Sequence, residues 1–189
     1  MIVALLLTMV CCIVLGMGVP TTATYCIMAA TCAPILMSPD IGVEMLAAHF
    51  FVFYFGIVAD ITPPVALAAY AGAAISGGDP LKTGVNASKL GIAAFIVPYV
   101  FVLSPALLGI NASAGQIVMT TITALIGMIG ISSAMMGYLY RRLNAIERLI
   151  IFAAGLCLID PESFTDLVGI VVMVAVVLFQ YMRERKAAR

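Results

Sequence analysis

The chain has 189 residues, of which 64% are hydrophobic and 10% are charged, and its formal net charge is zero. With a mean hydropathy of +1.20, it is expected to be an all-α integral membrane protein, because several apolar runs approach the ~20 residues of a spanning helix. These runs are too long for the ~10-residue alternating strands of an outer-membrane barrel. No basic patch supports nucleic-acid binding. No phosphate-binding loop or nucleophile elbow is present, so neither an enzyme nor a cofactor is expected.

Two short apolar arms come first. Residues 1–15 would form a helix of about 22 Å, which is shorter than the ~30 Å hydrocarbon core, and residues 23–37 form the second arm. The segment between them, residues 16–22, reads GMGVPTT. This pattern predicts a re-entrant helical hairpin with its tip near mid-membrane; two ordinary helices joined by a turn are the alternative.

A carboxylate and two prolines interrupt the next apolar run. Residues 44–59 and 65–76 are expected to be helical, and residues 60–64 between them read DITPP. A charged Asp60 at mid-membrane costs roughly 2.5–3.5 kcal/mol. The two prolines lack an N–H, so the carbonyls of Ala59 and Asp60 should lose their helical partners. Such backbone is tolerated at membrane depth only inside protein or beside a wet cavity, which predicts a broken transmembrane helix at an ion or substrate site.

The rest of the chain follows from its apolar runs and helix breakers. Asp79-Pro80 is a plausible helix start within a polar interfacial connector, and Pro98 is a plausible kink. Gly127 and Gly130 interrupt a long span and permit close helix contact. The connector is residues 77–89, and the further helices are residues 90–108, 113–140, 149–159 and 167–181. We expect a first domain at residues 1–110, and C-terminal helices with a basic tail at residues 111–189.

Basic residues predict the orientation. The arginines of residues 141–148 and the basic tail mark cytoplasmic ends, and an acidic loop at residues 160–166 lies outside. Counting back through single crossings places Lys82 and Lys89 inside and Asp40 outside. This count favours one tilted crossing for residues 44–76 over a second hairpin, and the first hairpin's tip would be approached from the outer face.

The two breaks together have the layout of a transport site. A helix restarts after each, with Thr21 or Thr22 beside Pro20 at the first, and with Thr62 as N-cap and Pro63 at the first helical position of the second. Free N–H groups at helix starts suit an anionic substrate, and carbonyls at helix ends suit a cation. Discontinuous helices that meet at mid-membrane are typical of secondary transporters. Simple packing kinks, and pairing of the Asp60 carboxylate with a basic residue of another chain, are the alternatives.

His49 and the cysteines are expected to be structural. His49 precedes Asp60 by eleven residues, or three helical turns. We expect a satisfied interfacial histidine there, with a proton relay as the alternative. Five cysteines lack metal-ligand spacing and are expected to be buried free thiols: Cys11, Cys12, Cys26, Cys32 and Cys157.

Three segments resemble the C-terminal part of the large membrane subunit of tripartite ATP-independent periplasmic (TRAP) transporters. They read LGMGVPTTATYCIMAATCAPIL, AAHFFVFYFGIVADITPPVALAAYAGAAISGGDPLKTG and LGIAAFIVPYVFVLSPALL, in that order. The GMGVPTTA and AAHFFVFYF versions resemble the TAXI subfamily, whose permeases are usually fused. The resemblance is dense over residues 15–108 and weaker to residue 189.

The resemblance implies half of an inverted-repeat elevator transporter in the inner membrane of a bacterium or archaeon. It implies import of a small organic acid with sodium, or alternatively a proton, and delivery by a periplasmic binding protein. The hairpin tip and the helix break would form half of the substrate and cation sites. Their residues are Gly16, Gly18, Pro20, Thr21, Thr22, Thr24, Gly56, Ala59, Asp60, Thr62, Pro63 and Pro64, with Ala59, Asp60 and Thr62 as possible sodium ligands.

The chain departs from the family in what precedes the hairpin. In a complete relative, the first repeat, the scaffold helices and the small-subunit helices lie upstream of Met1. We therefore expect a C-terminal fragment that needs the missing N-terminal half as a partner. A non-transporting membrane scaffold or assembly subunit with kinked helices is the rival hypothesis, and an ion channel is disfavoured.

Overall fold

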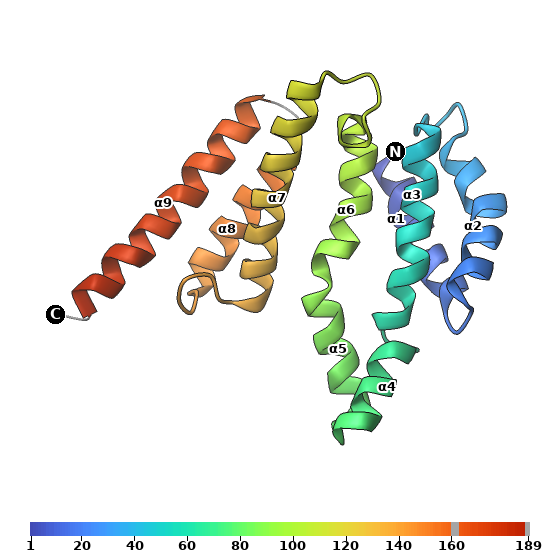
Figure 1. The fold of residues 1–189 in the computed structure, drawn as a ribbon, viewed down its shortest axis with the longest axis horizontal. Helices are drawn as coiled ribbons and strands as arrows, with labels where there is room; N and C mark the ends of the chain where they lie inside the picture. The colour runs from blue at the N-terminus through green and yellow to red at the C-terminus, as the bar shows by residue number, and fades with distance from the viewer. Residues whose placement is uncertain (160–162, 188–189) are drawn as a thin grey trace. The chain divides into compact units, whose positions relative to one another are not determined.

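The computed structural model describes residues 1–159 and 163–187, which form two compact units, Met1–Leu108 and Gly109–Arg189. All the regular elements in this part of the chain are helices, apart from an isolated bridge between Tyr138 and Arg142 (Figure 1). The all-α prediction is confirmed. Residues 160–162 of the predicted acidic loop and residues 188–189 of the basic tail lie outside the described residues.

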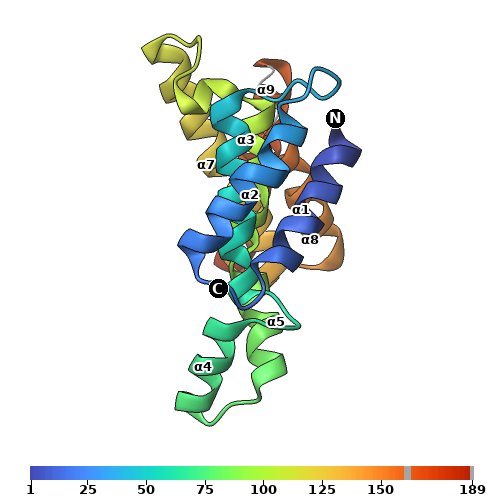
Figure 2. The ribbon, with the colours of Figure 1, turned by 90° about the vertical axis from the view of Figure 1, so that its right-hand side faces the viewer.

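Helix α3 (Met45–Val58) is the centre of the first unit. Helices α1 (Ile2–Gly16), α2 (Thr21–Leu36) and α6 (Ile92–Leu103) pack around it (Figures 1 and 2). It begins where the Glu44 carboxylate accepts the N–H groups of Leu46 and Ala47 at 2.7 and 3.2 Å, which supplies the missing partners of a first helical turn. Its inner face holds Phe51 and Phe55, both fully buried, so the aromatic run of α3 forms the core of this unit.

The two predicted arms form the helices α1 and α2, which a short turn joins. The two helices contain 15 and 16 residues, so each is about 22–24 Å long and shorter than a bilayer core. Gly18 makes the turn between them at φ +75°. The predicted restart of the helix at Thr21 or Thr22 beside Pro20 is confirmed: α2 begins at Thr21, and Pro20 occupies the cap position without a side-chain hydrogen bond.

The predicted break after α3 is confirmed, but its capping is different. One 3₁₀ turn, η1 (Ala59–Ile61), follows α3, and α4 (Leu67–Ser76) begins only after Ala66 at φ 36°. Thr62 is therefore not an N-cap, and Pro63 is not the first helical residue. Thr62 is extended (φ −106°, ψ 122°), because the residue before a proline is disfavoured in the helical region.

The predicted connector at residues 77–89 is largely helical. Asp79 accepts the Lys82 N–H at 2.8 Å and begins α5 (Pro80–Leu90), which confirms the Asp79-Pro80 start. Helix α4 packs on α5 rather than on α3. In Figures 1 and 2 it continues away from the end of α3, and α5 and α6 return. The two halves of the broken helix therefore do not fold back on each other as a hairpin.

Helix α6 is shorter than the single helix predicted for residues 90–108. It ends at Leu103, and a 3₁₀ turn, η2 (Pro105–Leu108), follows Ser104. The shortening has a local cause: Ser104 leaves the helical region at φ −130°, ψ 80°, as the residue before a proline tends to do. Pro98 is tolerated inside α6.

The second unit consists of α7 (Ala114–Met136), α8 (Ala145–Cys157) and α9 (Ser163–Ala187), which pack together. Helix α7 runs unbroken through Gly127 and Gly130, so the predicted interruption is wrong. The predicted close contact is confirmed, because a Cβ on Gly127 would lie 2.8 Å from the Gly155 carbonyl oxygen of α8.

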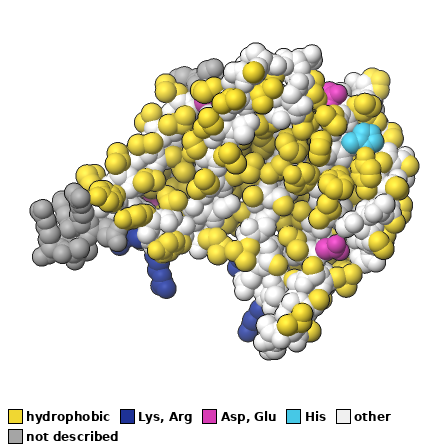
Figure 3. Space-filling model, viewed as in Figure 1, with side chains coloured by type: hydrophobic (Ala, Val, Ile, Leu, Met, Phe, Trp, Pro, Cys, Tyr) yellow, Lys and Arg dark blue, Asp and Glu magenta, His cyan; other side chains and the backbone are white. Residues whose placement is uncertain are grey.

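Three helical segments in the described part of the chain are long and apolar enough to cross a membrane: Pro80–Leu103, Ala114–Met136 and Thr165–Met182. Hydrophobic side chains cover much of the face in Figure 3, as lipid contact would require.

The cysteines in this structure are free, as predicted, but they are not all buried. Cys12 and Cys32 are buried, whereas Cys11 and Cys26 are exposed. Neighbouring positions on a helix are separated by 100° of rotation, so Cys11 and Cys12 cannot both face the core.

Candidate substrate and ion site

The hairpin tip packs directly against the helix break. A Cβ on Gly16, at the end of α1, would lie 2.9 Å from the Gly56 carbonyl oxygen and 3.0 Å from the Ala59 Cβ. A Cβ on Gly56 would lie 3.0 Å from the Thr24 Cγ2. Four of the predicted site residues therefore meet where α1, α2 and α3 come together. Two glycines make this possible, because a side chain on either would separate the helices.

Thr24 holds the tip together. It is 1% exposed, and its hydroxyl donates to the Val19 carbonyl at 3.2 Å. This bond ties the first turn of α2 to the loop that precedes it. Thr24 thus supports the shape of the tip, a role that the sequence pattern did not indicate.

The start of α2 offers backbone donors. Thr21 and Thr22 are exposed, and their N–H groups precede the first intrahelical bonds of α2. No side chain caps this end. Pro20 and Gly18 are exposed as well, so the partial positive charge of the helix start faces outward. An anionic group can approach these donors without displacing a cap.

Asp60 offers acceptor oxygens. Its side chain is half-buried, and among the residues that the structure describes its carboxylate has no hydrogen-bond or ion-pair partner. Its carbonyl lacks helical donors because both Pro63 and Pro64 are without an N–H. The Ala59 carbonyl, by contrast, accepts the Thr62 N–H at 3.2 Å. The prediction that it loses its helical partner is corrected, because the 3₁₀ turn supplies one.

The Thr62 hydroxyl closes α3. It donates to the Val58 carbonyl at 2.6 Å, which replaces a backbone bond lost at the break. The oxygen still has acceptor lone pairs. Of the two prolines, Pro63 is half-buried and Pro64 is exposed.

Helix α5 holds the break from the other side, which the sequence interpretation missed. The Ser88 hydroxyl lies 2.9 Å from the Ile61 carbonyl oxygen, and the Tyr70 hydroxyl of α4 donates to the Pro64 carbonyl at 2.7 Å. A Cβ on Gly84 would lie 3.2 Å from the Pro63 Cγ, and one on Gly91 would lie 2.7 Å from the Ile61 Cδ1. The sequence did contain a signal for this contact: the small residues at positions 84, 88 and 91 are spaced so that they lie on one face of a helix.

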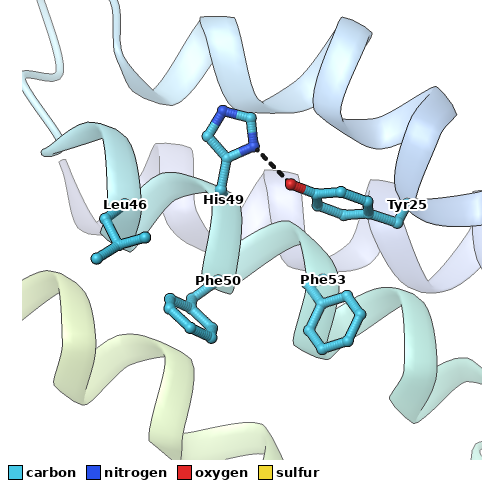
Figure 4. Close-up of a pocket in the computed structure, with 5 residues that line it drawn as sticks. All are labelled: Tyr25, Leu46, His49, Phe50 and Phe53. Carbon is cyan, nitrogen blue, oxygen red and sulfur yellow. Dashed lines mark hydrogen bonds between the residues drawn. The ribbon is translucent and has the colours of Figure 1, made fainter. Parts of the chain in front are cut away.

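His49 has a partner away from the break. Its Nδ1 lies 3.1 Å from the Tyr25 hydroxyl, which confirms the satisfied histidine. Figure 4 shows the pair beside a groove of about 220 Å³, lined also by Leu46, Phe50 and Phe53. The groove contains none of the predicted site residues. Nor do the described residues contain a cluster of three His, Cys, Asp or Glu side chains that could hold a metal ion.

Two family models match the chain. The family described as Tripartite ATP-independent periplasmic transporter, DctM component, matches residues 1–116, which include the hairpin and the break. A second family, described as Domain of unknown function (DUF3394), matches residues 117–170. No curated protein and no solved structure matches the chain. Because the first match covers more than half of the sequence, the chain belongs to the DctM component family of tripartite ATP-independent periplasmic transporters.

Proposed function

We propose that the first unit supplies half of the substrate and cation sites of a secondary transporter that imports a small organic acid. The observation that carries the proposal is the packing of Gly16 on Gly56 and Ala59. This contact joins the loop that leads into the uncapped start of α2 to the turn that contains Asp60. Helix α1 packs on both α2 and the turn η1, so it connects the donors at the start of α2 with the acceptors around Asp60.

The start of α2 would bind the substrate carboxylate. The N–H groups of Thr21 and Thr22 precede the first intrahelical bonds, and the helix dipole adds a partial positive charge at this end. The threonine hydroxyls add further donors. Helix starts of this kind bind anions in many proteins.

The turn at Asp60 would bind the coupling cation. Its carboxylate, its carbonyl and the Thr62 hydroxyl are oxygen donors, which hard cations prefer. The Ala59 carbonyl could add another. With a proton as the coupling ion, Asp60 alone would carry it, because it is the one ionisable group of this turn. Both forms of coupling use the same carboxylate.

The proposal includes partners. Family membership supports a periplasmic binding protein that delivers the acid. The opposing half of the site would come from an N-terminal repeat of a TAXI-type fused permease, in the inner membrane of a bacterium or archaeon. Together the two halves would form an elevator-type symporter.

The test is uptake by the complete permease in proteoliposomes, with its binding protein present. Asp60→Asn should lower cation-coupled uptake at least tenfold, as expected when about 1.4 kcal/mol or more of ion binding is lost. Asp40→Asn, which removes an exposed carboxylate from the loop between α2 and α3, should leave uptake unchanged. Equal uptake and equal ion dependence in both variants would refute the site.

Separate ion gradients distinguish the two couplings. A sodium gradient at constant pH should drive uptake if sodium is the coupling ion. A pH gradient without sodium should drive uptake if the coupling ion is a proton. Thr62→Val should weaken sodium dependence, whereas Thr62→Ser keeps the hydroxyl and should retain it. If neither gradient drives uptake, coupling through this chain is excluded.

A further inference from the structure

The end of the α7–α8 hairpin in the second unit is basic, and Glu147 is the carboxylate near it among the described side chains. Arg142 is exposed and Arg141 is half-buried in the turn between the helices. The nearby carboxylate of Glu147 already accepts the Asn144 N–H at 3.0 Å and the Gln180 Nε2 at 3.3 Å. Among the described side chains, Arg141, Arg142 and Arg148 stand against the single carboxylate of Glu147 at this end, which leaves a net positive charge.

Arg148 extends this charge along the helix end. Its Nε donates to the Ala134 carbonyl at 2.7 Å, and its Nη2 donates to the Met135 carbonyl at 3.1 Å. These bonds fix the guanidinium beside the C-terminal turn of α7. Two of its five N–H donors are used, and three remain for an anion.

An apolar groove adjoins the fixed guanidinium. It has a volume of about 320 Å³ and is lined by Ala134, Met135, Ala145, Arg148, Leu149 and Phe152. Leu149 is 71% exposed and Ile146 is 74% exposed, so the surroundings are hydrophobic and accessible. The groove thus combines one charged end with apolar walls.

Aromatic side chains at this end are typical of a membrane surface. Tyr138 and Tyr140 are exposed, and the Tyr140 ring lies 6.0 Å from that of Tyr181 on α9. Tyrosines gather at the headgroup level of bilayers. By the positive-inside rule the arginines belong to the cytoplasmic leaflet, where anionic lipids are concentrated.

We propose that this groove binds an anionic phospholipid. The headgroup phosphate interacts with Arg148 and with the turn at Arg141 and Arg142, and an acyl chain lies along Met135, Leu149 and Phe152. A zwitterionic lipid has a compensating ammonium and gains less from the arginines. The expected preference is about fivefold for each basic residue near the surface. The site belongs to the segment of unknown function and goes beyond the transport proposal.

The absence of tryptophan from the chain permits a site-specific test. Leu149→Trp in the full chain places one fluorophore at the groove. Vesicles with brominated phosphatidylglycerol or brominated phosphatidylcholine then report the relative binding of each lipid by quenching. We expect phosphatidylglycerol to be preferred at least fivefold at this position. Ile122→Trp, at a 48% exposed position on α7 remote in sequence from the groove, should show no preference.

Charge-removing variants show whether the arginines cause the preference. Arg141→Gln with Arg142→Gln should lower the lipid preference of the Leu149→Trp chain by roughly fivefold for each arginine removed. Lys82→Gln with Lys89→Gln removes the same amount of charge from α5 and should leave the lipid preference unchanged. Circular dichroism checks that each variant retains its helices.

Five outcomes would overturn the proposal. The first four are equal quenching by both lipids at Leu149→Trp, the same preference at Ile122→Trp, a preference that loss of both arginines leaves unchanged, and its loss in the lysine control. Inorganic phosphate at millimolar concentration should not compete when ionic strength is matched with chloride. If it does, the site binds a free anion and the lipid assignment is wrong. Because the readout is lipid contact and not uptake, the result does not depend on the transport proposal.

Discussion

At the scale of single residues, glycines determine how closely the hairpin approaches the break. The Cβ that Gly16 lacks would fall 2.9 Å from a carbonyl oxygen of α3, a distance that real Cβ atoms do not tolerate. The sequence indicated that Gly16 belongs to a turn. It did not indicate that Gly16 contacts α3, because its partner Gly56 lies forty positions later in the chain.

Gly16→Ala should lower the free energy of unfolding by about 1–3 kcal/mol, as overpacking of a tight contact usually does. Gly72→Ala on α4 is the control, since no atom lies within 4 Å of its would-be Cβ. That change should stabilise the helix by about 0.5–1 kcal/mol. Denaturation in mixed detergent micelles measures both. If Gly16→Ala were as stable as the parent, the tip would not be in direct contact with α3.

The prediction of Thr62 as an N-cap was wrong for a reason that its own hydrogen bond shows. A threonine before a proline is a reasonable N-cap when only the following residues are considered. The hydroxyl instead donates to the Val58 carbonyl four residues earlier. The two choices have the same local chemistry, and the position of the preceding helix decides between them.

At the scale of elements, α5 is the support of the broken helix. The Ser88 hydroxyl donates to the Ile61 carbonyl, and Gly84 and Gly91 leave space for Pro63 and Ile61. A break inside a membrane protein needs such partners, because unsatisfied carbonyls are costly away from water. The polar composition of residues 77–89 suggested a connector. One of its polar side chains, Ser88, forms a hydrogen bond to the backbone of the break.

Ser88→Ala should loosen the break without unfolding the unit. Loss of one hydrogen bond is worth about 1 kcal/mol, or roughly fivefold in local opening. The N–H groups of Thr62 and Ala66, which bond to Ala59 and Thr62 carbonyls, should exchange with deuterium correspondingly faster. Asn86→Ala on the exposed face of α5 should leave the exchange rates of both N–H groups unchanged. Unchanged exchange in Ser88→Ala would show that α5 does not stabilise the turn.

The α7–α8 pair depends on reciprocal glycine contacts. A Cβ on Gly155 would lie 2.7 Å from the Gly127 carbonyl oxygen, so Gly155→Ala should destabilise the second unit by about 1–3 kcal/mol. Gly115→Ala, in the open first turn of α7, should not. Thermal denaturation followed by circular dichroism makes the comparison. Equal melting of both variants would contradict a close α7–α8 contact.

At the scale of the whole molecule, the distribution of charge predicts the orientation in the bilayer. Leu81→Cys and Ala145→Cys, each introduced into a chain without native cysteines, should react with an impermeant maleimide only from the cytoplasmic side. Asp40→Cys should react only from the outside. All three positions are exposed. Labelling of Ala145→Cys from outside would reverse the orientation and remove the argument for a cytoplasmic lipid site.

The sequence by itself determined the membrane class, the hairpin and the break. These features depend on local chemistry: apolar runs of helical length, a glycine at positive φ, and prolines that lack an N–H. Only the tertiary structure decided that Gly16 contacts α3, that Ser88 holds Ile61, and which cysteines are buried. Each of these depends on which helix lies opposite, and that is set by packing between residues distant in the chain. Local composition specifies where the helix must break, but only the neighbouring helices specify which groups form hydrogen bonds with the backbone at the break.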